Sequence, residues 1–347
     1  MNQTGNHFRR LRHFGLLFTV IGASLFAYFI YQTGVDTIFL DIQKLGFGFA
    51  LVLILYVLRL TVRSSAWMLC LEKPHKLNFF NAFQSVTIGE ALSSMLPFGV
   101  VISGTAKAIA VRKQLPLVVG LSSLAIENFF YSLSTAVLLI VGASVFLSKF
   151  PLEGNLRNVG FALIAAAGFV IALFLILIIA QWRFLSTTAK MFRRFDVFKS
   201  EQLKTENEPS KFDKFIEQIV RFENNFYGFY RRNSRRFLPL ISLQFTFHLL
   251  GIAEVWLVLK FISDANTTFQ TAFLLETVNR AVIVFFKFVP FALGVDEAGA
   301  QFVAETLGIG ASIGVSLAII RKGRVLFWAT IGVILIAVKG INLREQL

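Results

Sequence analysis

The chain is poor in the residues that cross-linked, metal-binding and many catalytic sites require. Its 347 residues include one cysteine, Cys70, and four histidines, His7, His13, His75 and His248. A single cysteine excludes an internal disulfide and a cysteine-based metal cluster. The sequence contains no His-Glu-x-x-His zinc motif, phosphate-binding P-loop or nucleophile elbow. We therefore predict no metal site, no cofactor and no catalytic residues, and we favour a role other than catalysis.

Acidic residues are also scarce, whereas apolar residues are abundant. The chain has 34 Lys and Arg against 20 Asp and Glu, a net charge of +14. It lacks the basic and aromatic modules of nucleic-acid-binding proteins, so we predict no nucleic-acid partner. It is 56% hydrophobic, has 40 Phe and has a mean hydropathy of +0.68. In so apolar a chain, basic residues orient the protein in a bilayer and contact anionic lipid at the cytoplasmic face.

Six apolar runs are each long enough for the about 20 residues that span a bilayer. They cover residues 14–32, 46–71, 117–147, 159–181, 237–262 and 310–340. No small-residue cleavage signature follows the first run, so we expect an uncleaved anchor. The sequence therefore predicts an all-α, polytopic integral membrane protein with about six full spans.

The distribution of charge predicts the topology. Arg9, Arg10 and Arg12 precede the first apolar run, and the loop 182–236 holds 13 Lys and Arg against 7 Asp and Glu. Both segments are expected in the cytoplasm, because positively charged loops stay on that side. Counting spans from these two points places both ends of 79–111 in the cytoplasm. The same count places the N- and C-termini there.

The stretch 79–111 is apolar but interrupted. At 33 residues it is short for two crossings of about 20 residues each, and Pro97, Gly99 and Gly104 lie near its middle. We expect a broken, re-entrant helical hairpin that enters from the cytoplasm. Non-helical backbone survives at membrane depth only when it is buried in protein or lines a wet cavity.

The stretch 271–308 is interrupted in the same way, at Pro290 and Gly294. By the same count of spans it would enter the membrane from outside. At 38 residues it could also form two nearly complete crossings, which leaves the topology unchanged. We predict a second broken hairpin here.

Short matches at a constant offset of 193 residues indicate a duplication. Pro97-Phe98 aligns with Pro290-Phe291, and Ser123-Leu124-Ala125-Ile126 aligns with Ser316-Leu317-Ala318-Ile319. Because the matching segments run in opposite directions, the predicted repeats are inverted, as in many transporters with a substrate site between the repeats. The predicted parts are an N-terminal half, a basic cytoplasmic loop and an inverted C-terminal half, at 1–181, 182–236 and 237–347.

The cytoplasmic loop contains an amphipathic pattern. Phe212, Phe215, Ile216, Ile219 and Phe222 recur at helical spacing with charged residues between them. We expect a helix that packs on the membrane domain or lies at the interface.

Ionisable residues inside predicted spans are costly and tend to mark function. Arg59 and Arg63 lie on one helix face with Trp67, and Arg59 is too deep to reach the surface cheaply. Arginine offers a planar fork for phosphate or carboxylate. The alternative is a structural ion pair with Glu90 or Glu127.

The second half carries a matching set of charges. Glu276 and Arg280 are spaced to pair with each other on one helix. Asp296 and Glu297 follow Gly294, where a half-helix is expected to begin. These two residues either bind ligand or simply cap the N-terminus of that helix. The candidate substrate-binding residues of both halves are Arg59, Arg63, Lys107, Glu127, Arg280, Asp296, Glu297, Arg321 and Arg324. Their mixed charge, with basic residues in excess, suits a headgroup that carries phosphate, with or without an amine.

Several of these residues also carry a family resemblance. They are Arg59-x-x-x-Arg63-x-x-x-Trp67, Leu96-Pro97-Phe98-Gly99 with Gly104 and Lys107, Glu127, Val289 to Glu297, Leu307-Gly308 and Arg321. Over approximately 14–340, the chain resembles the membrane domain of the lysylphosphatidylglycerol synthase/flippase-like family.

The resemblance implies an inner-membrane protein that moves lipids between leaflets, or a membrane domain attached to a lipid-modifying enzyme. The aminoacyltransferase domain of bifunctional members is not among these 347 residues, so we do not expect the chain itself to make lysyl-lipid.

We predict a transporter or flippase for a phosphate-bearing lipid, either a phospholipid or a polyprenyl-phosphate-linked lipid. The alternatives are an integral-membrane transferase acting on a lipid-linked substrate and a non-catalytic partner of a lipid-modifying enzyme. Membrane lipids are the expected partners in each case, and the oligomeric state is left open.

Overall fold

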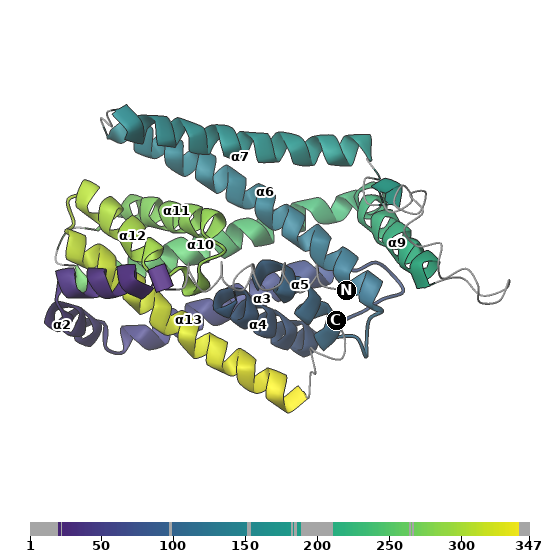
Figure 1. Ribbon diagram of the computed structural model, residues 1–347, viewed down its shortest axis with the longest axis horizontal. Helices are drawn as coiled ribbons and strands as arrows, with labels where there is room; N and C mark the ends of the chain where they lie inside the picture. The colour runs from purple at the N-terminus through teal and green to yellow at the C-terminus, as the bar shows by residue number, and fades with distance from the viewer. Residues whose placement is uncertain are drawn as a thin grey trace, which may run out of the picture.

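The computed structural model describes residues 20–21, 23–96, 99–150, 154–181, 183, 186–188, 211–263, 265 and 267–339. Within these ranges the chain forms helices and short connections, without a strand. The longer helices run roughly along the length of the molecule (Figure 1). The predicted all-α class is confirmed. The predicted break at Pro97 lies outside the described residues.

In the N-terminal half, helical residues 20–21 and 23–33 precede a helix, α2 (Val35–Leu45), that the sequence pattern did not predict. The labelled elements of this half are α2, α3 Gly48–Leu69, α4 Phe79–Met95, α5 Gly99–Ala110, α6 Leu117–Lys149 and α7 Gly154–Ala180. Asp41 of α2 is buried and accepts a hydrogen bond of 2.7 Å from Ser316, which ties α2 to the last long helix.

The remaining elements form the C-terminal part of the chain. They are α9 Lys211–Arg232, η2 Ser234–Arg236, α10 Phe237–Ile262, α11 Phe269–Phe285, η3 Pro290–Ala292, α12 Val295–Thr306 and α13 Ala311–Lys339. The helix α9 contains the segment with the amphipathic pattern, and Ile216 on it is buried while Phe215 is exposed.

Four helices in the described part are long and apolar enough to cross a membrane. They cover Gly48–Leu69, Leu117–Lys149, Arg157–Ala180 and Ser234–Ile262. The helix α13 is 29 residues long, but Arg321, Lys322 and Arg324 interrupt its apolar character. A polytopic membrane fold therefore fits the chain, while the number of full spans stays a prediction.

Two broken helical hairpins lie in opposite ends of the bundle. The helices α4 and α5 have 17 and 12 residues, and α11 and α12 also have 17 and 12 residues. The first pair lies toward the end that carries α9, and the second pair lies toward the other end (Figure 1). The helix α4 packs against α13, and α11 packs against α6, so each hairpin contacts the long helix of the other half.

The second hairpin is interrupted by a strained turn. Phe291 and Ala292 have φ values of 53° and 48°, in the left-handed region that costs about 1–3 kcal/mol for residues other than glycine. Gly294 has a φ of 77°, which glycine adopts freely, and α12 begins at the next residue. The break predicted at Pro290 and Gly294 is therefore present in the structure.

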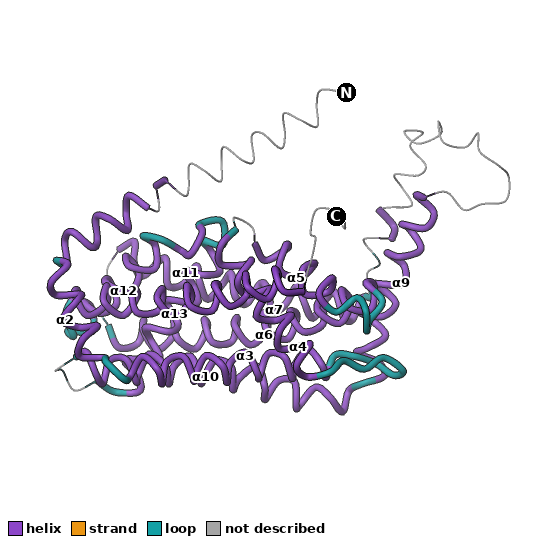
Figure 2. The backbone as a smooth tube through the Cα atoms, turned by 90° about the horizontal axis from the view of Figure 1, so that it is seen from below, coloured by secondary structure: helices purple, strands orange, loops and turns teal. Residues whose placement is uncertain are grey.

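The charged residues lie between two apolar cores. One core includes Val52 of α3, and the other includes Leu60 and Trp67 of the same helix. Arg59 and Arg63 thus sit near the boundary between the two cores. The helices α3 and α10 form one face of the bundle, whereas α5, α11 and α12 lie toward the opposite face (Figure 2).

Candidate functional site

A cavity of about 390 Å³ lies where the two hairpins meet the long helices. Eight basic and two acidic side chains line it, namely Arg59, Arg63, Lys107, Arg280, Lys287, Arg321, Lys322 and Arg324, with Glu90 and Asp296. Seven of the nine predicted substrate-binding residues are among them. The other two, Glu127 and Glu297, lie behind the wall in contact with lining residues.

Carboxylates behind the wall make this concentration of positive charge tolerable. Glu127, Glu254, Glu276 and Glu297 are all buried, and each forms an ion pair with a basic residue of the lining. Buried charges need such partners, because an isolated charge in an apolar medium is very costly. With these four carboxylates included, eight basic residues face six acidic ones, so the site keeps an excess of positive charge.

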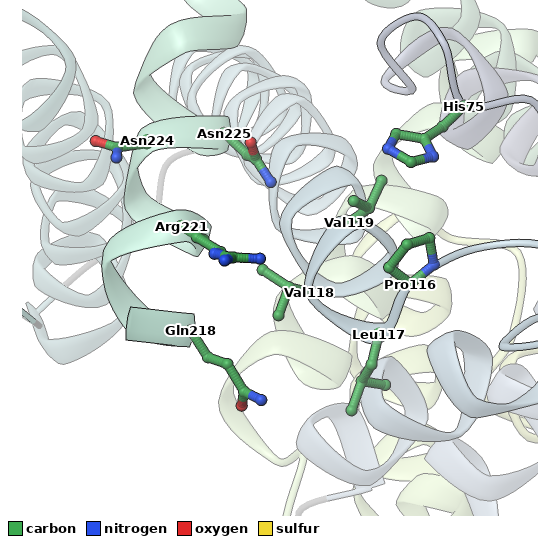
Figure 3. A pocket seen from close by; sticks show the side chains of 9 residues that line it. All are labelled: His75, Pro116, Leu117, Val118, Val119, Gln218, Arg221, Asn224 and Asn225. Carbon is green, nitrogen blue, oxygen red and sulfur yellow. The ribbon is translucent and has the colours of Figure 1, made fainter. Parts of the chain in front are cut away.

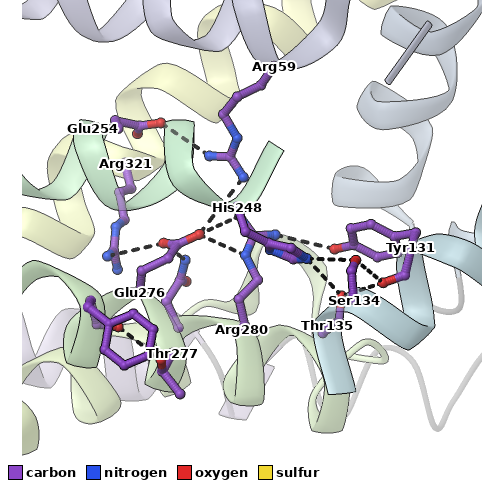
Figure 4. A network of polar contacts seen from close by, with 12 residues as sticks. Arg59, Tyr131, Ser134, Thr135, His248, Glu254, Glu276, Thr277, Arg280 and Arg321 are labelled. Atoms are coloured by element: carbon purple, nitrogen blue, oxygen red, sulfur yellow. Dashed lines mark hydrogen bonds and ion pairs between the residues drawn. The ribbon is translucent and has the colours of Figure 1, made fainter. Parts of the chain in front are cut away.

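Glu276 is the centre of the largest group of contacts (Figure 4). It accepts hydrogen bonds of 2.7 Å from Arg280 Nε and 3.1 Å from Asn279. Arg59 and Arg321 lie farther away, with nitrogen–oxygen distances of 3.9 and 3.7 Å. The pairing of Glu276 with Arg280 that their spacing predicted is confirmed.

A glycine makes room for this group. Gly251 of α10 faces Glu276 so closely that a Cβ at this position would lie 2.5 Å from Glu276 Oε1 and 3.4 Å from Arg59 Cζ. The helix α10 can therefore approach the buried ion pairs only because residue 251 has no side chain.

The partner of Arg59 is a residue that sequence reasoning missed. Arg59 Nη1 donates to Glu254 of α10 at 3.2 Å, and Arg324 also binds Glu254. The guanidinium of Arg59 stacks over Phe247, 4.4 Å from the ring centre. The alternative of an ion pair with Glu90 or Glu127 does not hold for Arg59. The signal for Glu254 was its place as an acidic residue inside the apolar run 237–262.

Those two carboxylates pair with Arg63 instead. Arg63 donates to Glu90 at 2.7 Å and lies 3.4 Å from Glu127 Oε1. Lys107 of α5 reaches the same Glu90 at 3.4 Å. Tyr131 lies under the guanidinium of Arg63, with 4.8 Å from Cζ to the ring centre. This group joins α3, α4, α5 and α6 at one wall of the cavity.

Asp296 and Glu297 do not cap α12. The N-cap residue is Gly294, and no side chain forms a cap hydrogen bond there. Lys322 lies 2.6 Å from Glu297 and 3.6 Å from Asp296, and Arg321 lies 3.7 Å from Asp296. The capping interpretation is therefore wrong for both residues. Lys322 was missed because the sequence alone does not show which face of α13 points inward.

Across the described ranges, Arg321 forms ion pairs but no hydrogen bond through its terminal nitrogens. Its side chain is 5% exposed, and neither Nη1 nor Nη2 has a hydrogen-bond acceptor among the described residues. The two carboxylates beside it are too distant for hydrogen bonds, at 3.7 Å. Buried donors are almost always satisfied, yet these two nitrogens of Arg321 are held by ion pairs alone in the described part of the chain.

The predicted hinge glycines and prolines differ in whether they line the cavity. Gly104 lines the cavity. Gly99 starts α5 against the backbone of α4, where a Cβ would lie 2.7 Å from Ser93. Pro290 opens η3 and Gly294 precedes α12, and neither lines the cavity.

A second hollow, of about 620 Å³, lies between α9 and the start of α6 (Figure 3). Gln218, Arg221, Asn224 and Asn225 of α9 and His75 give it a polar character. It belongs to the end of the bundle that the charge pattern places in the cytoplasm.

Hydrogen bonds hold α9 and the start of α10 against the end of α3. Arg232 donates to Glu72 at 2.6 Å, and these hydrogen bonds raise the pKa of Arg232 above its ordinary value. Arg236 donates to the carbonyl oxygens of Leu69 and Leu71 at 2.9 and 2.6 Å. Carbonyl groups at a helix end need such donors, because they have no partner within the helix.

These features define a polytopic helical membrane protein with a charged internal cavity. The chain belongs to the family described as the lysylphosphatidylglycerol synthase TM region, whose model matches residues 14–332. The predicted family is thus confirmed, and it links this membrane protein to lipid handling. Neither a curated protein nor a solved structure matches the chain significantly.

Proposed function

We propose that the protein moves a phosphate-bearing lipid, a phospholipid or a polyprenyl-phosphate-linked lipid, between the two leaflets. The observation that carries this proposal is the lining of the cavity, where eight basic side chains, Arg321 among them, face two acidic ones. A phosphate offers several oxygens to a planar guanidinium and matches it better than a neutral group does. The family supports a lipid as the bearer of that phosphate.

The size and the charge of the cavity suit a headgroup. Its volume of about 390 Å³ lies within the roughly 300–1,000 Å³ typical of ligand sites. Its excess of basic residues would compensate the negative charge of a phosphate. The headgroup passes through this polar cavity while the acyl chains remain in lipid, which lowers the cost of moving a charge through hydrocarbon.

The proposed arrangement in the membrane follows from charge. The end of the bundle with α9 carries Arg221, Arg231, Arg232, Arg235 and Arg236, and we place this end in the cytoplasm against anionic lipid of the inner membrane. The two hairpins then enter from opposite sides as inverted repeats, and both termini lie in the cytoplasm. This arrangement supports access to the cavity from either leaflet.

The test is lipid transfer in liposomes that contain the purified protein. Fluorescent phospholipids and a fluorescent polyprenyl phosphate are scored by quenching with dithionite from outside. We expect transfer that depends on the headgroup and falls at least about tenfold in Arg321→Gln, the loss expected for hydrogen bonds to a charged group. The matched control is Arg157→Gln, an exposed arginine of α7 outside the cavity lining.

Two results would overturn the proposal. One is the absence of transfer of any phosphate-bearing lipid by folded wild-type protein. The other is full activity of Arg321→Gln. The same preparations should then be tested for turnover of lipid-linked substrates, since a membrane transferase was the main alternative from the sequence.

A further inference from the structure

The cavity opens on one side, at the end of α11. Among the described residues that line it, Ile283, Phe286 and Lys287 are exposed, and the others are buried or partly buried. The arginines that line it lie deeper, and Arg59 and Arg321 are 3% and 4% exposed. The mouth of the cavity therefore lies beside residues 283–287.

This mouth faces the side of the bundle rather than one of its ends. The helices α4 and α11 each have 17 residues, so each is about 25 Å long at 1.5 Å per residue. The two helices start from opposite ends of the bundle (Figure 1). The short helix η3 follows the end of α11, and it contacts α4. The ends of the two hairpins thus meet partway along the bundle, and we expect lipid beside an exposed residue there.

The rim of the mouth is apolar apart from one lysine. Phe285 and Phe286 are 52% and 37% exposed, and at the end of α4 Met95 and Leu96 are 39% and 36% exposed. Between such side chains Lys287 is exposed, and no hydrogen bond or ion pair joins it to another residue in the described part of the chain. An unpaired ammonium in hydrocarbon is costly, so a lysine at this depth is expected to have an anionic partner.

We infer that Lys287 binds the phosphate of a membrane lipid at a lateral mouth, before the headgroup passes inward to Arg321. The inference rests on the proposed function and adds where the lipid is captured. The ammonium can present three rotatable donors to phosphate oxygens. The exposed rings of Phe285 and Phe286 offer apolar contacts to the acyl chains of the same lipid. Lipid and free phosphate share the chemistry that Lys287 recognises, and the test must separate them.

The experiment removes the positive charge at residue 287 and then adds a positive or a negative charge there by chemical modification of a cysteine. Cys70 is the only native cysteine and is buried, so Lys287→Cys introduces the one accessible thiol of the described chain. We expect transfer of fluorescent phosphatidylglycerol to fall about tenfold or more, as for the loss of a hydrogen bond to a charged group. Aminoethyl methanethiosulfonate restores a positive charge and should restore transfer, whereas sulfonatoethyl methanethiosulfonate adds a negative charge and should not.

Lys260→Cys is the matched control. Lys260 is an exposed lysine of α10 that lies over Trp256 and does not line the cavity. Its replacement and both modifications should leave transfer within about twofold of the wild type, as for a surface change outside the site.

The outcomes separate this inference from the proposed function. If the wild type transfers lipid and Lys287→Cys does so equally well, capture at Lys287 is wrong while transport stands. If the wild type transfers nothing, the proposed function itself fails. Inorganic phosphate and glycerol phosphate are added as soluble competitors. Inhibition by either at a concentration comparable to that of the lipid would identify a site for free phosphate and overturn capture of a lipid.

Discussion

The two broken hairpins share their helix lengths but hold their charges differently. In the first hairpin the side chain of Glu90 is 26% exposed and pairs with Arg63 and Lys107. In the second hairpin the side chain of Glu276 is 2% exposed and contacts Arg280 and Arg321. Glu90 lies open to the cavity, whereas Glu276 lies behind Arg280 and Arg321, which line the cavity. Similar backbones thus provide one adaptable wall and one rigid wall.

The difference arises from where the partners come in the chain. Glu276 and Arg280 lie four residues apart on α11, so their pair forms with the helix itself. Glu90, Lys107 and Arg63 come from three different helices and meet only when those helices pack. We expect the second group to matter more for stability and the first group to matter more for ligand exchange.

Neutralising Glu276 should have the largest effect on stability. Glu276→Gln leaves Arg280, Arg321 and Arg59 without their common carboxylate, and breaking a buried pair in this way costs about 3–5 kcal/mol. Thermal unfolding of the purified protein in detergent should show a clear fall in the unfolding temperature. The control is Glu217→Gln on α9, where both partners of the ion pair with Arg221 are exposed. That change should cost less than about 1 kcal/mol. Equal stability of the two variants would contradict the idea of a rigid wall.

A methyl group beside Glu276 should have an intermediate effect. The Cβ in Gly251→Ala would press on Glu276 Oε1 at 2.5 Å, and overpacking of this kind costs about 1–3 kcal/mol. Gly168→Ala is the control, because α7 offers open space around that position. In an ordinary helix interior the exchange of glycine for alanine stabilises by about 1 kcal/mol. Opposite signs for the two variants, measured by unfolding in detergent, would support the close fit, and a stabilised Gly251→Ala would refute it.

Neutralising Glu90 should have the smallest effect on stability. Because Glu90 is the more exposed of the two carboxylates, we expect Glu90→Gln to cost less than Glu276→Gln. The change leaves Lys107 buried without its carboxylate, so adding Lys107→Met should recover most of the loss. Unfolding of the single and double variants measures this coupling. A loss as large as that of Glu276→Gln would show that both walls are equally rigid.

Local features of the chain were predictable from the sequence, whereas partners between helices were not. The run 237–262 predicted α10 well, yet Glu254 on it was overlooked, and its partner Arg59 lies 195 residues earlier. For Arg63 the sequence left open ligand binding or an ion pair with Glu90 or Glu127, and the structure shows both ion pairs. Such pairs depend on how each helix is rotated and how deep it sits. On a helix that is apolar all round, the hydrophobic pattern shows poorly which face points inward, so it constrains the rotation and the depth of the helix only loosely.

The sequence by itself determined that this is a helical membrane protein with two broken segments. Long apolar runs can satisfy their backbone in lipid only as helices, and Pro290 and Gly294 interrupt a helix wherever it lies. The tertiary structure alone decided which charges meet. It placed Arg321 beside Glu276 and Asp296 in the lining of the cavity and Lys287 among the exposed lining residues, because helices from both halves pack around one space. Charges this far apart in sequence can be matched only by packing, since local backbone preferences act over a few residues.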